Sequence, residues 1–156
     1  MAEKQYETEP YIKEYRAQLA KVDEIAQIAL KGHLEVEASL DEAVGAIFRR
    51  KDWLKETKLS FFKNATLMRA YAEHENENYL WPLMFTLNSL RNNIAHGGPS
   101  TKRTSKIDEL RNKVRGFGGK DFKAFIAKAS EQDVITHAAA LCRGFLLKYE
   151  AAIRGV

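Results

Sequence analysis

Apolar residues recur at the three-to-four-residue spacing of a helix along nearly the whole chain. Only three prolines and nine glycines interrupt this pattern in 156 residues. No segment shows the two-residue alternation of a half-buried strand. The pattern predicts an all-α fold, an up-and-down bundle of four to five main helices. A chain of this length corresponds to one domain, which we assign to residues 11–156 after an N-terminal tail over 1–10.

Helix start and stop signals indicate where the helices lie. A first helix is expected over about residues 11–31, ended or bent at Gly32, and a second over about 33–50. The second helix either continues the first or begins at a break near Ser39, which matches a capping box. Further helices are expected over about residues 58–72, 79–96, 105–115, 120–129 and 133–154, with a loop over 74–78.

The cysteine content and the absence of targeting signals indicate a compartment. Cys142 is the single cysteine, which excludes an internal disulfide and favours a reducing environment. The longest uncharged run, residues 78–90, contains Pro82 and is too short to span a bilayer. The first residues lack the apolar core of a signal peptide. We therefore expect a cytoplasmic protein without membrane association.

Positive charge is concentrated in one segment. The chain carries 25 basic and 21 acidic residues, for a net charge of +4. Residues 102–123 hold eight basic and three acidic side chains, so this segment carries +5 and the remainder −1. A localised basic segment is typical of phosphate contact. The alternative is a solvated face that binds no ligand.

Charged residues interrupt two otherwise apolar helix faces. At about 100° per residue, Arg91 lies inside the apolar stripe of the helix expected over 79–96. Glu37 and Asp41 lie one turn apart within the apolar arc of the helix expected over 33–50. Because an unpaired buried charge is costly, Arg91 must either extend its charged end to solvent or pair with an acid, and these two acids could pair with it inside the bundle. Such a pair either fixes helix register or forms part of a functional polar site.

His96 ends the helix that carries Arg91. An ideal helix places the two side chains about 140° apart, so they do not share a face unless the helix end unwinds. A histidine in the last turn can also simply interact with the negative end of the helix dipole.

The run from Leu90 to Gly97, Leu-Arg-Asn-Asn-Ile-Ala-His-Gly, resembles the Arg-x4-His signature of HEPN domains. These are small all-helical domains, many of them ribonucleases in toxin–antitoxin, abortive-infection and CRISPR-associated systems. Residues 31–48 also resemble the second long helix of such domains. The resemblance covers about residues 11–96 and, more loosely, the closing helix.

The resemblance implies a metal-independent endoribonuclease of a toxin or phage-defence type that needs no cofactor. Arg91, Asn92 and His96 are the catalytic residues it implies, with Glu37 and Asp41 in support. Histidine titrates near neutral pH and can move the proton of an RNA 2′-hydroxyl, while arginine can stabilise charge on a phosphoryl group. Because one chain supplies one such pair, the resemblance implies a homodimer with a composite site that leaves a 2′,3′-cyclic phosphate.

The resemblance also suggests partners. The basic segment follows the motif directly, so Lys102, Arg103 and Lys106 are candidate RNA contacts. An antitoxin or effector protein is a further candidate partner. Some HEPN toxins carry a tyrosine two residues after the histidine, which a nucleotidyltransferase antitoxin modifies; here that position is Gly98. Two alternatives stay open: a catalytically silent HEPN-like regulatory or interaction module, and a simple helical dimer without a ligand.

Overall fold

The computed structural model describes residues 9–20, 23–48, 51–72 and 80–155, and within these ranges it contains helices and no strand. The all-α prediction is therefore confirmed. The helices are α1 (Glu9–Ala20), α2 (Glu24–Ile47), α3 (Lys51–Glu56), α4 (Phe61–Tyr71), α5 (Leu80–Ala95), α6 (Ser100–Arg115), α7 (Lys120–Lys128) and α8 (Glu131–Arg154).

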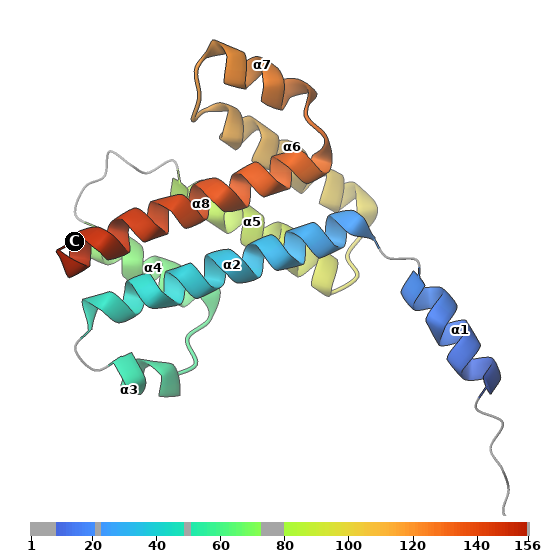
Figure 1. Cartoon of the computed structure of the whole chain (residues 1–156), viewed down its shortest axis with the longest axis horizontal. Helices are drawn as coiled ribbons and strands as arrows, with labels where there is room; N and C mark the ends of the chain where they lie inside the picture. The colour runs from blue at the N-terminus through green and yellow to red at the C-terminus, as the bar shows by residue number, and fades with distance from the viewer. Residues whose placement is uncertain (1–8, 21–22, 49–50, 73–79, 156) are drawn as a thin grey trace, which may run out of the picture.

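The bundle is built around the two longest helices, α2 and α8, which lie side by side and run in the same direction (Figure 1). From α5 to α8, successive helices alternate in direction, as an up-and-down bundle requires (Figure 1). α5 contacts α2, α6 and α8, and α4 packs on α2 and α5. α7 covers α6 at one end, whereas α1 projects away from the bundle (Figure 1).

The core consists of apolar side chains from every helix between α2 and α8 except α3. Its largest fully buried apolar members are Leu40, Met68, Leu83, Met84, Leu87, Leu90, Ile107, Leu110, Ile126, Ile135 and Leu146. Cys142 is also fully buried, and burial raises the pKa of its thiol to about 12. A thiol in this environment stays protonated and packs as a small apolar group.

Of the two expectations at Gly32, an end or bend is wrong and continuity is correct, because α2 runs through it without interruption. The single helix expected over residues 11–31 is wrong, since α1 ends at Ala20 and α2 begins at Glu24. A Cβ at Gly32 would lie 3.1 Å from the Cβ of Ala139, so glycine here serves the close approach of α2 to α8. The alternative break near Ser39 is also wrong, since the Ser39 hydroxyl donates to the carbonyl of Glu35 inside the helix. The helix begins instead after Asp23, whose carboxylate accepts from the backbone N–H of Ala26 at 3.1 Å.

Other boundaries differ by less. The expected tail ends earlier, because α1 already includes residues 9 and 10. The short α3 was not predicted, and the helix expected over 58–72 begins at Phe61 after the Ser60 cap. α6 begins at Ser100, five residues before its predicted start, directly after Pro99. The loop expected over 74–78 lies outside the described residues.

Polar contacts fix α6 and α7 to the rest of the bundle. The carboxylate of Glu109 accepts from the buried Thr86 hydroxyl of α5 at 2.8 Å. The Arg111 guanidinium donates to the carbonyls of Ile126 and Ala129, at 2.8 and 2.7 Å, where α7 ends. The end of a helix leaves its last carbonyls short of intrahelical donors, and Arg111 supplies a donor to two of them, in addition to the Ala129 N–H that reaches the Ile126 carbonyl at 3.4 Å. Among the described helices, none has the combination of length and apolar composition needed to cross a bilayer.

The contact at Gly32 leads to the first prediction. We expect Gly32→Leu to lower the free energy of unfolding by about 1–3 kcal/mol, because the larger side chain must push α2 and α8 apart. Gly144 on α8 is the matched control, since a Cβ there meets no atom within 4 Å. Gly144→Ala should raise the free energy of unfolding by about 0.5–1 kcal/mol. Urea denaturation followed by circular dichroism measures both, and equal stability of Gly32→Leu and wild type would contradict the packing role.

Candidate active site

His96 lies at the C-terminal boundary of α5, where the helix ends in a Schellman motif. Gly97 adopts the left-handed conformation at φ 61°. Its N–H donates to the Ile94 carbonyl at 3.2 Å, and the N–H of Gly98 donates to the Asn93 carbonyl at 2.8 Å. His96 is therefore the C-cap residue, and its side chain is exposed to solvent.

Gly98 fits closely against the side chain of Asn93, which is 9% exposed. A Cβ at Gly98 would lie 2.0 Å from Asn93 Nδ2, so any larger residue would displace the carboxamide. The position where some HEPN toxins carry tyrosine therefore has no room for a side chain in this conformation.

Arg91 and Asn92 are both half-buried on α5. Arg91 Nη1 donates to Asn92 Oδ1 at 3.1 Å, so the neighbouring carboxamide orients the guanidinium. Among the described acidic side chains, none forms an ion pair with Arg91. The guanidinium thus keeps its positive charge available at the edge of the bundle.

Arg91 and His96 remain on different sides of α5. The N–H of His96 donates to the Asn92 carbonyl at 3.1 Å, so helical geometry persists as far as the C-cap. The separation of about 140° expected for an ideal helix therefore applies. One chain alone does not bring these two side chains onto one face.

Glu37 lies beside a buried histidine rather than in an ion pair with Arg91. Its Oε2 is 3.9 Å from Nδ1 of His33, which is 1% exposed. On the other side of the imidazole, Nε2 lies 3.0 Å from Asn88 Oδ1. Because a carboxamide oxygen only accepts, Nε2 carries the proton, and the buried Nδ1 has no hydrogen-bond partner. The ring also packs against Phe61, with 4.6 Å between centroids.

The surroundings of His33 favour its neutral form. Burial is the largest effect and lowers the pKa of His33 below its usual 6.5, and the nearby charge of Arg91 lowers it further. The carboxylate of Glu37 and the hydrogen bond with Asn88 act in the opposite direction but do not outweigh burial. His33, Asn88 and Arg91 therefore form a polar cluster between α2 and α5.

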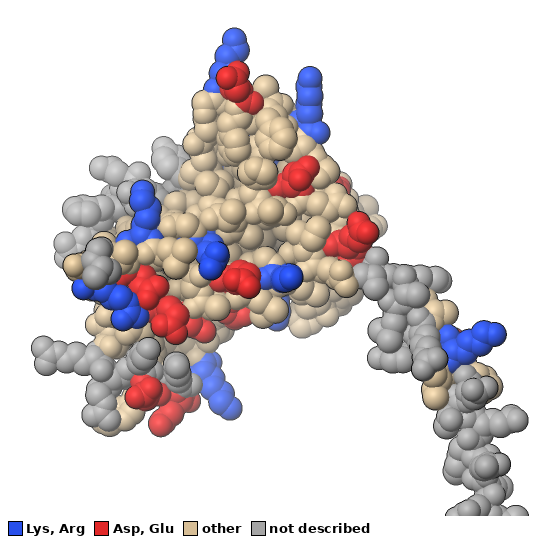
Figure 2. Space-filling view, in the orientation of Figure 1, with Lys and Arg blue, Asp and Glu red and all other residues tan. Residues whose placement is uncertain are grey.

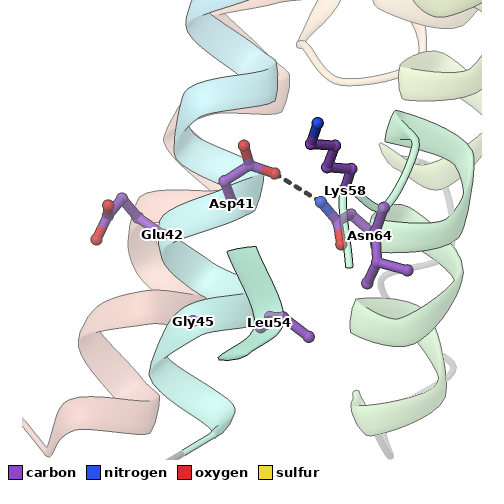
Figure 3. Close-up of a pocket in the computed structure, with 7 residues that line it drawn as sticks. Asp41, Glu42, Gly45, Leu54, Lys58 and Asn64 are labelled. Carbon is purple, nitrogen blue, oxygen red and sulfur yellow. Dashed lines mark hydrogen bonds between the residues drawn. The ribbon is translucent and has the colours of Figure 1, made fainter. Parts of the chain in front are cut away.

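Asp41 lies further along α2 and contacts α4. Its Oδ1 accepts from Asn64 Nδ2 at 2.6 Å, as the dashed line in Figure 3 shows. The prediction that both acids lie within the buried arc of α2 is wrong, because Asp41 is exposed and Glu37 is half-buried. The structure places their carboxylates next to Asn64 and His33. Neither joins Arg91 in an ion pair.

Two of the three expected RNA contacts make ion pairs within the bundle. Arg103 donates to the Asp23 carboxylate through both Nη atoms, one of them at 2.7 Å, and this bond holds the pKa of Asp23 at about 2. Lys106 Nζ lies 2.8 Å from Glu109 Oε2. Lys102 is exposed and forms no ion pair with a described side chain.

The charged groups on the face shown in Figure 2 are mixed. Acidic and basic side chains alternate over α2 and α8, and lysines extend from α7 above them (Figure 2). The pairs Arg143–Glu35 and Arg154–Glu42, each at 3.8 Å, link the two long helices on exposed side chains. This face therefore does not present one continuous basic surface.

Sequence analysis missed the partnership of His33 with Asn88 and of Asp41 with Asn64. His33 falls on the buried arc of α2, and this position was a signal that it needs a polar partner. The partners themselves come from other helices, so no local pattern identifies them. Within the described ranges, no three His, Cys, Asp or Glu side chains form a cluster that could hold a metal ion.

Comparison with known proteins adds no assignment. The chain matches no protein-family model, no curated protein and no solved structure.

The buried imidazole leads to the second prediction. Folding lowers the pKa of His33 below the 6.5 that it has in the unfolded chain. Above pH 6.5 the imidazole is neutral in both states, so the folded protein keeps its full stability. As the pH falls below 6.5, the unfolded chain takes up the proton more readily, and the free energy of unfolding decreases. We expect the free energy of unfolding to decrease between about pH 8 and about pH 5.5 in wild type. His33→Gln keeps an amide near Asn88 but does not titrate, so the decrease should be smaller. Identical pH dependence of the two proteins would show that His33 is not the titrating group.

Proposed function

We propose that the chain is a HEPN-like, metal-independent endoribonuclease of a toxin or defence type that acts as a homodimer. The observation that carries this proposal is the arrangement of α5. Its Arg91 is oriented by Asn92 and free of any described acidic partner, and its capped end presents His96 to solvent. A single buried cysteine suits action in a reducing cytoplasm.

The Arg91 guanidinium is suited to contact a phosphodiester. A planar guanidinium can donate two parallel hydrogen bonds to phosphoryl oxygens, and its charge stabilises the additional negative charge of the transition state. Asn92 holds one edge of this group through Oδ1 at 3.1 Å. Besides burial, the charge of Arg91 lowers the pKa of the nearby His33, and neither the neutral imidazole nor Asn88 neutralises the guanidinium.

The separation of Arg91 from His96 supports a site made by two chains. Since the two side chains lie on different sides of one α5, a phosphate bound to Arg91 of one protomer requires a histidine from the other. An isologous dimer brings two copies of the same surface together and supplies two arginines and two histidines. The two histidines can then act as general base and general acid.

The proposed reaction is a transesterification that needs no metal. The neutral imidazole of one His96 takes the proton of the 2′-hydroxyl, and the 2′-oxygen attacks the adjacent phosphorus. As the bond from phosphorus to the 5′-oxygen breaks, the protonated imidazole of the second His96 gives its proton to the leaving oxygen. The products are a 2′,3′-cyclic phosphate and a 5′-hydroxyl, and the proton count balances.

Lys102 is the RNA contact that this proposal retains on α6. It follows the His96 end of α5 within one turn of α6 and is exposed. Arg103 and Lys106 are paired with Asp23 and Glu109 in the bundle. An RNA phosphate would have to compete with these carboxylates to bind them.

The pairing of Arg103 and Lys106 favours a second candidate. A catalytically silent HEPN-like domain would bind a regulatory protein, an antitoxin or an effector, and would need no free basic surface. In that case Arg91 and His96 would serve recognition or structure instead of chemistry.

The third prediction tests the ribonuclease. In the presence of EDTA, purified wild type should cleave total RNA or tRNA and leave cyclic-phosphate ends. Arg91→Ala and His96→Ala should each lose about 100-fold or more of the rate, because each removes a group that acts in the transition state. Gel analysis of end-labelled RNA measures the rate and the end chemistry.

Arg143→Ala is the matched control, since this exposed arginine of α8 lies outside the α5 motif. It should retain the wild-type rate, and light scattering should give twice the 17.8 kDa chain mass for all four proteins. Intact RNA with correctly folded protein would favour the silent regulatory module. Activity that survives both motif substitutions would contradict the assigned residues.

A further inference from the structure

Three aromatic rings gather where α7 packs beside the start of α8. The ring centroid of His137 lies 5.8 Å from that of Phe122 and 5.5 Å from that of Phe125. Phe122 is half-buried, whereas Phe125 is 50% exposed. We call Phe122, Phe125 and His137 the α7 platform. An exposed ring supported by other rings offers solvent an aromatic surface on which a further planar group can stack.

Three contacts hold the α7 platform in place. A Cβ at Gly118 would lie 2.1 Å from Cδ1 of Phe122, so the glycine backbone packs directly against this ring. Nδ1 of His137 donates to the carbonyl of Asp133 at 2.7 Å, because a carbonyl oxygen only accepts. Arg111 fixes the end of α7 through two of its last carbonyls. The rings therefore need little reordering to receive a ligand, which lowers the cost of binding.

The platform lies in the positively charged part of the molecule. Residues 102–137 hold nine basic and five acidic side chains, so α6, α7 and the start of α8 carry the whole net charge of +4. Lysines project from α7 into solvent in Figure 2. None of the α7 lysines forms an ion pair with a side chain in the described ranges; they are Lys120, Lys123 and Lys128.

The cations of α6 are less available than those of α7. Lys113 Nζ lies 3.5 Å from the carboxylate of Glu109, which also pairs with Lys106. On α7 the one acid is Asp121, and Lys128 follows Phe125 by three residues, so it is a neighbour of the exposed ring on the helix surface. Aromatic rings and unpaired lysines thus alternate along α7.

We propose that the α7 platform binds a base of single-stranded RNA, while the α7 lysines contact the phosphates on either side of it. In a single strand the face of a base is open to stack on an aromatic ring. Lysines attract the phosphates without imposing a fixed geometry. Because each of the four bases has such a face, the site has little sequence preference.

The composition of α7 favours RNA over a membrane or a protein partner. A helix that lies on a membrane inserts a broad apolar face. In α7, which the structure describes completely, Ile126 is buried in the core and Phe125 is the one exposed large apolar side chain. Lysine is depleted at the centre of protein–protein interfaces, whereas rings interspersed with cations are typical of single-strand binding surfaces.

The α7 platform lies at the same end of the bundle as the C-terminal end of α5. Figure 1 shows the start of α6, the end of α7 and the start of α8 at this end. The pKa of Arg103, raised mainly by its hydrogen bond with Asp23, is raised further by the charge of Glu131 on α8. A strand stacked on Phe125 can therefore continue across the start of α6 toward His96. This connection to cleavage rests on the proposed ribonuclease function.

The fourth prediction is base-dependent binding at Phe125. Fluorescence anisotropy of the full chain with a labelled 2′-O-methyl RNA 12-mer of mixed sequence should show saturable binding, weaker for an abasic 12-mer of the same charge. Phe125→Ala should lower the affinity for the base-containing oligomer by about five-fold or more and leave that for the abasic oligomer unchanged. Phe125→Trp should retain the wild-type affinity, since it restores a ring. Circular dichroism checks that both variants fold.

The lysines are tested by the salt dependence of the same binding. Lys128→Gln should weaken the binding of both oligomers and reduce the slope of log affinity against log salt concentration by about 0.7, the value expected for one phosphate contact with a single strand. Lys148→Gln, which removes an exposed lysine of α8, is its matched control. Phe62→Ala, which removes a 59% exposed phenylalanine of α4, is the matched control for Phe125→Ala. Both controls should bind as wild type does.

Several results would overturn the α7 platform as an RNA site. These are equal affinity of wild type and Phe125→Ala for the base-containing oligomer, an equal loss with the abasic oligomer, and no binding of either oligomer. Binding to phosphatidylserine vesicles in place of the oligomer, lost in Phe125→Ala, would assign the rings to a membrane surface instead.

The oligomer lacks the 2′-hydroxyl nucleophile, so its binding is measured independently of cleavage. Base-dependent binding without cleavage of ordinary RNA would contradict the ribonuclease and support the platform. Cleavage of ordinary RNA by a protein whose binding does not depend on Phe125 would contradict the platform and support the ribonuclease.

Discussion

The close contact between α2 and α8 is the constraint on which the rest of the structure depends. The two helices run in the same direction and approach where Gly32 faces Ala139, so their backbones lie nearer than larger side chains would allow. Interiors are packed too densely for such a contact to shift freely. The register of α2 against α8 then determines which residues of α2 face α4 and α5 on its other side, including His33 and Asp41.

That other side of α2 carries two polar contacts that each involve a buried side chain. His33 meets Asn88 of α5, and Asp41 meets Asn64 of α4, at 3.0 and 2.6 Å. Each contact leaves one buried atom without a partner, Nδ1 of His33 and Oδ1 of Asn64. Buried polar groups in folded proteins are normally satisfied, so two such atoms beside one helix, about two turns of α2 apart, are unusual.

Much of the fold was predictable from the sequence, whereas the site was predictable only in part. Helical periodicity and the start and stop signals predicted α5 to within one residue at each end. The role of Gly32 was predicted wrongly because the sequence alone does not distinguish a glycine that ends a helix from one that lets a neighbouring helix approach closely. The contact of Gly32 with Ala139 of α8 is visible only in the structure. The α6 cations were recognised as a basic segment, but the ion pair of Arg103 with Asp23 joins residues 80 positions apart. Arg91 and His96 were singled out by the resemblance of residues 90–97 to the HEPN motif, whereas their surroundings required the packed structure.

The close fit of Gly98 against Asn93 limits how the end of α5 can evolve. Gly97 needs a left-handed backbone, and Gly98 has a carboxamide where its Cβ would be. The two adjacent positions therefore tolerate almost no variation for different reasons, one conformational and one steric. A saturation-mutagenesis map of the chain would show an intolerant pair beside an exposed histidine. Such a pair would be mistaken for catalytic residues, although these two glycines instead fix the direction in which the chain leaves α5 and enters α6.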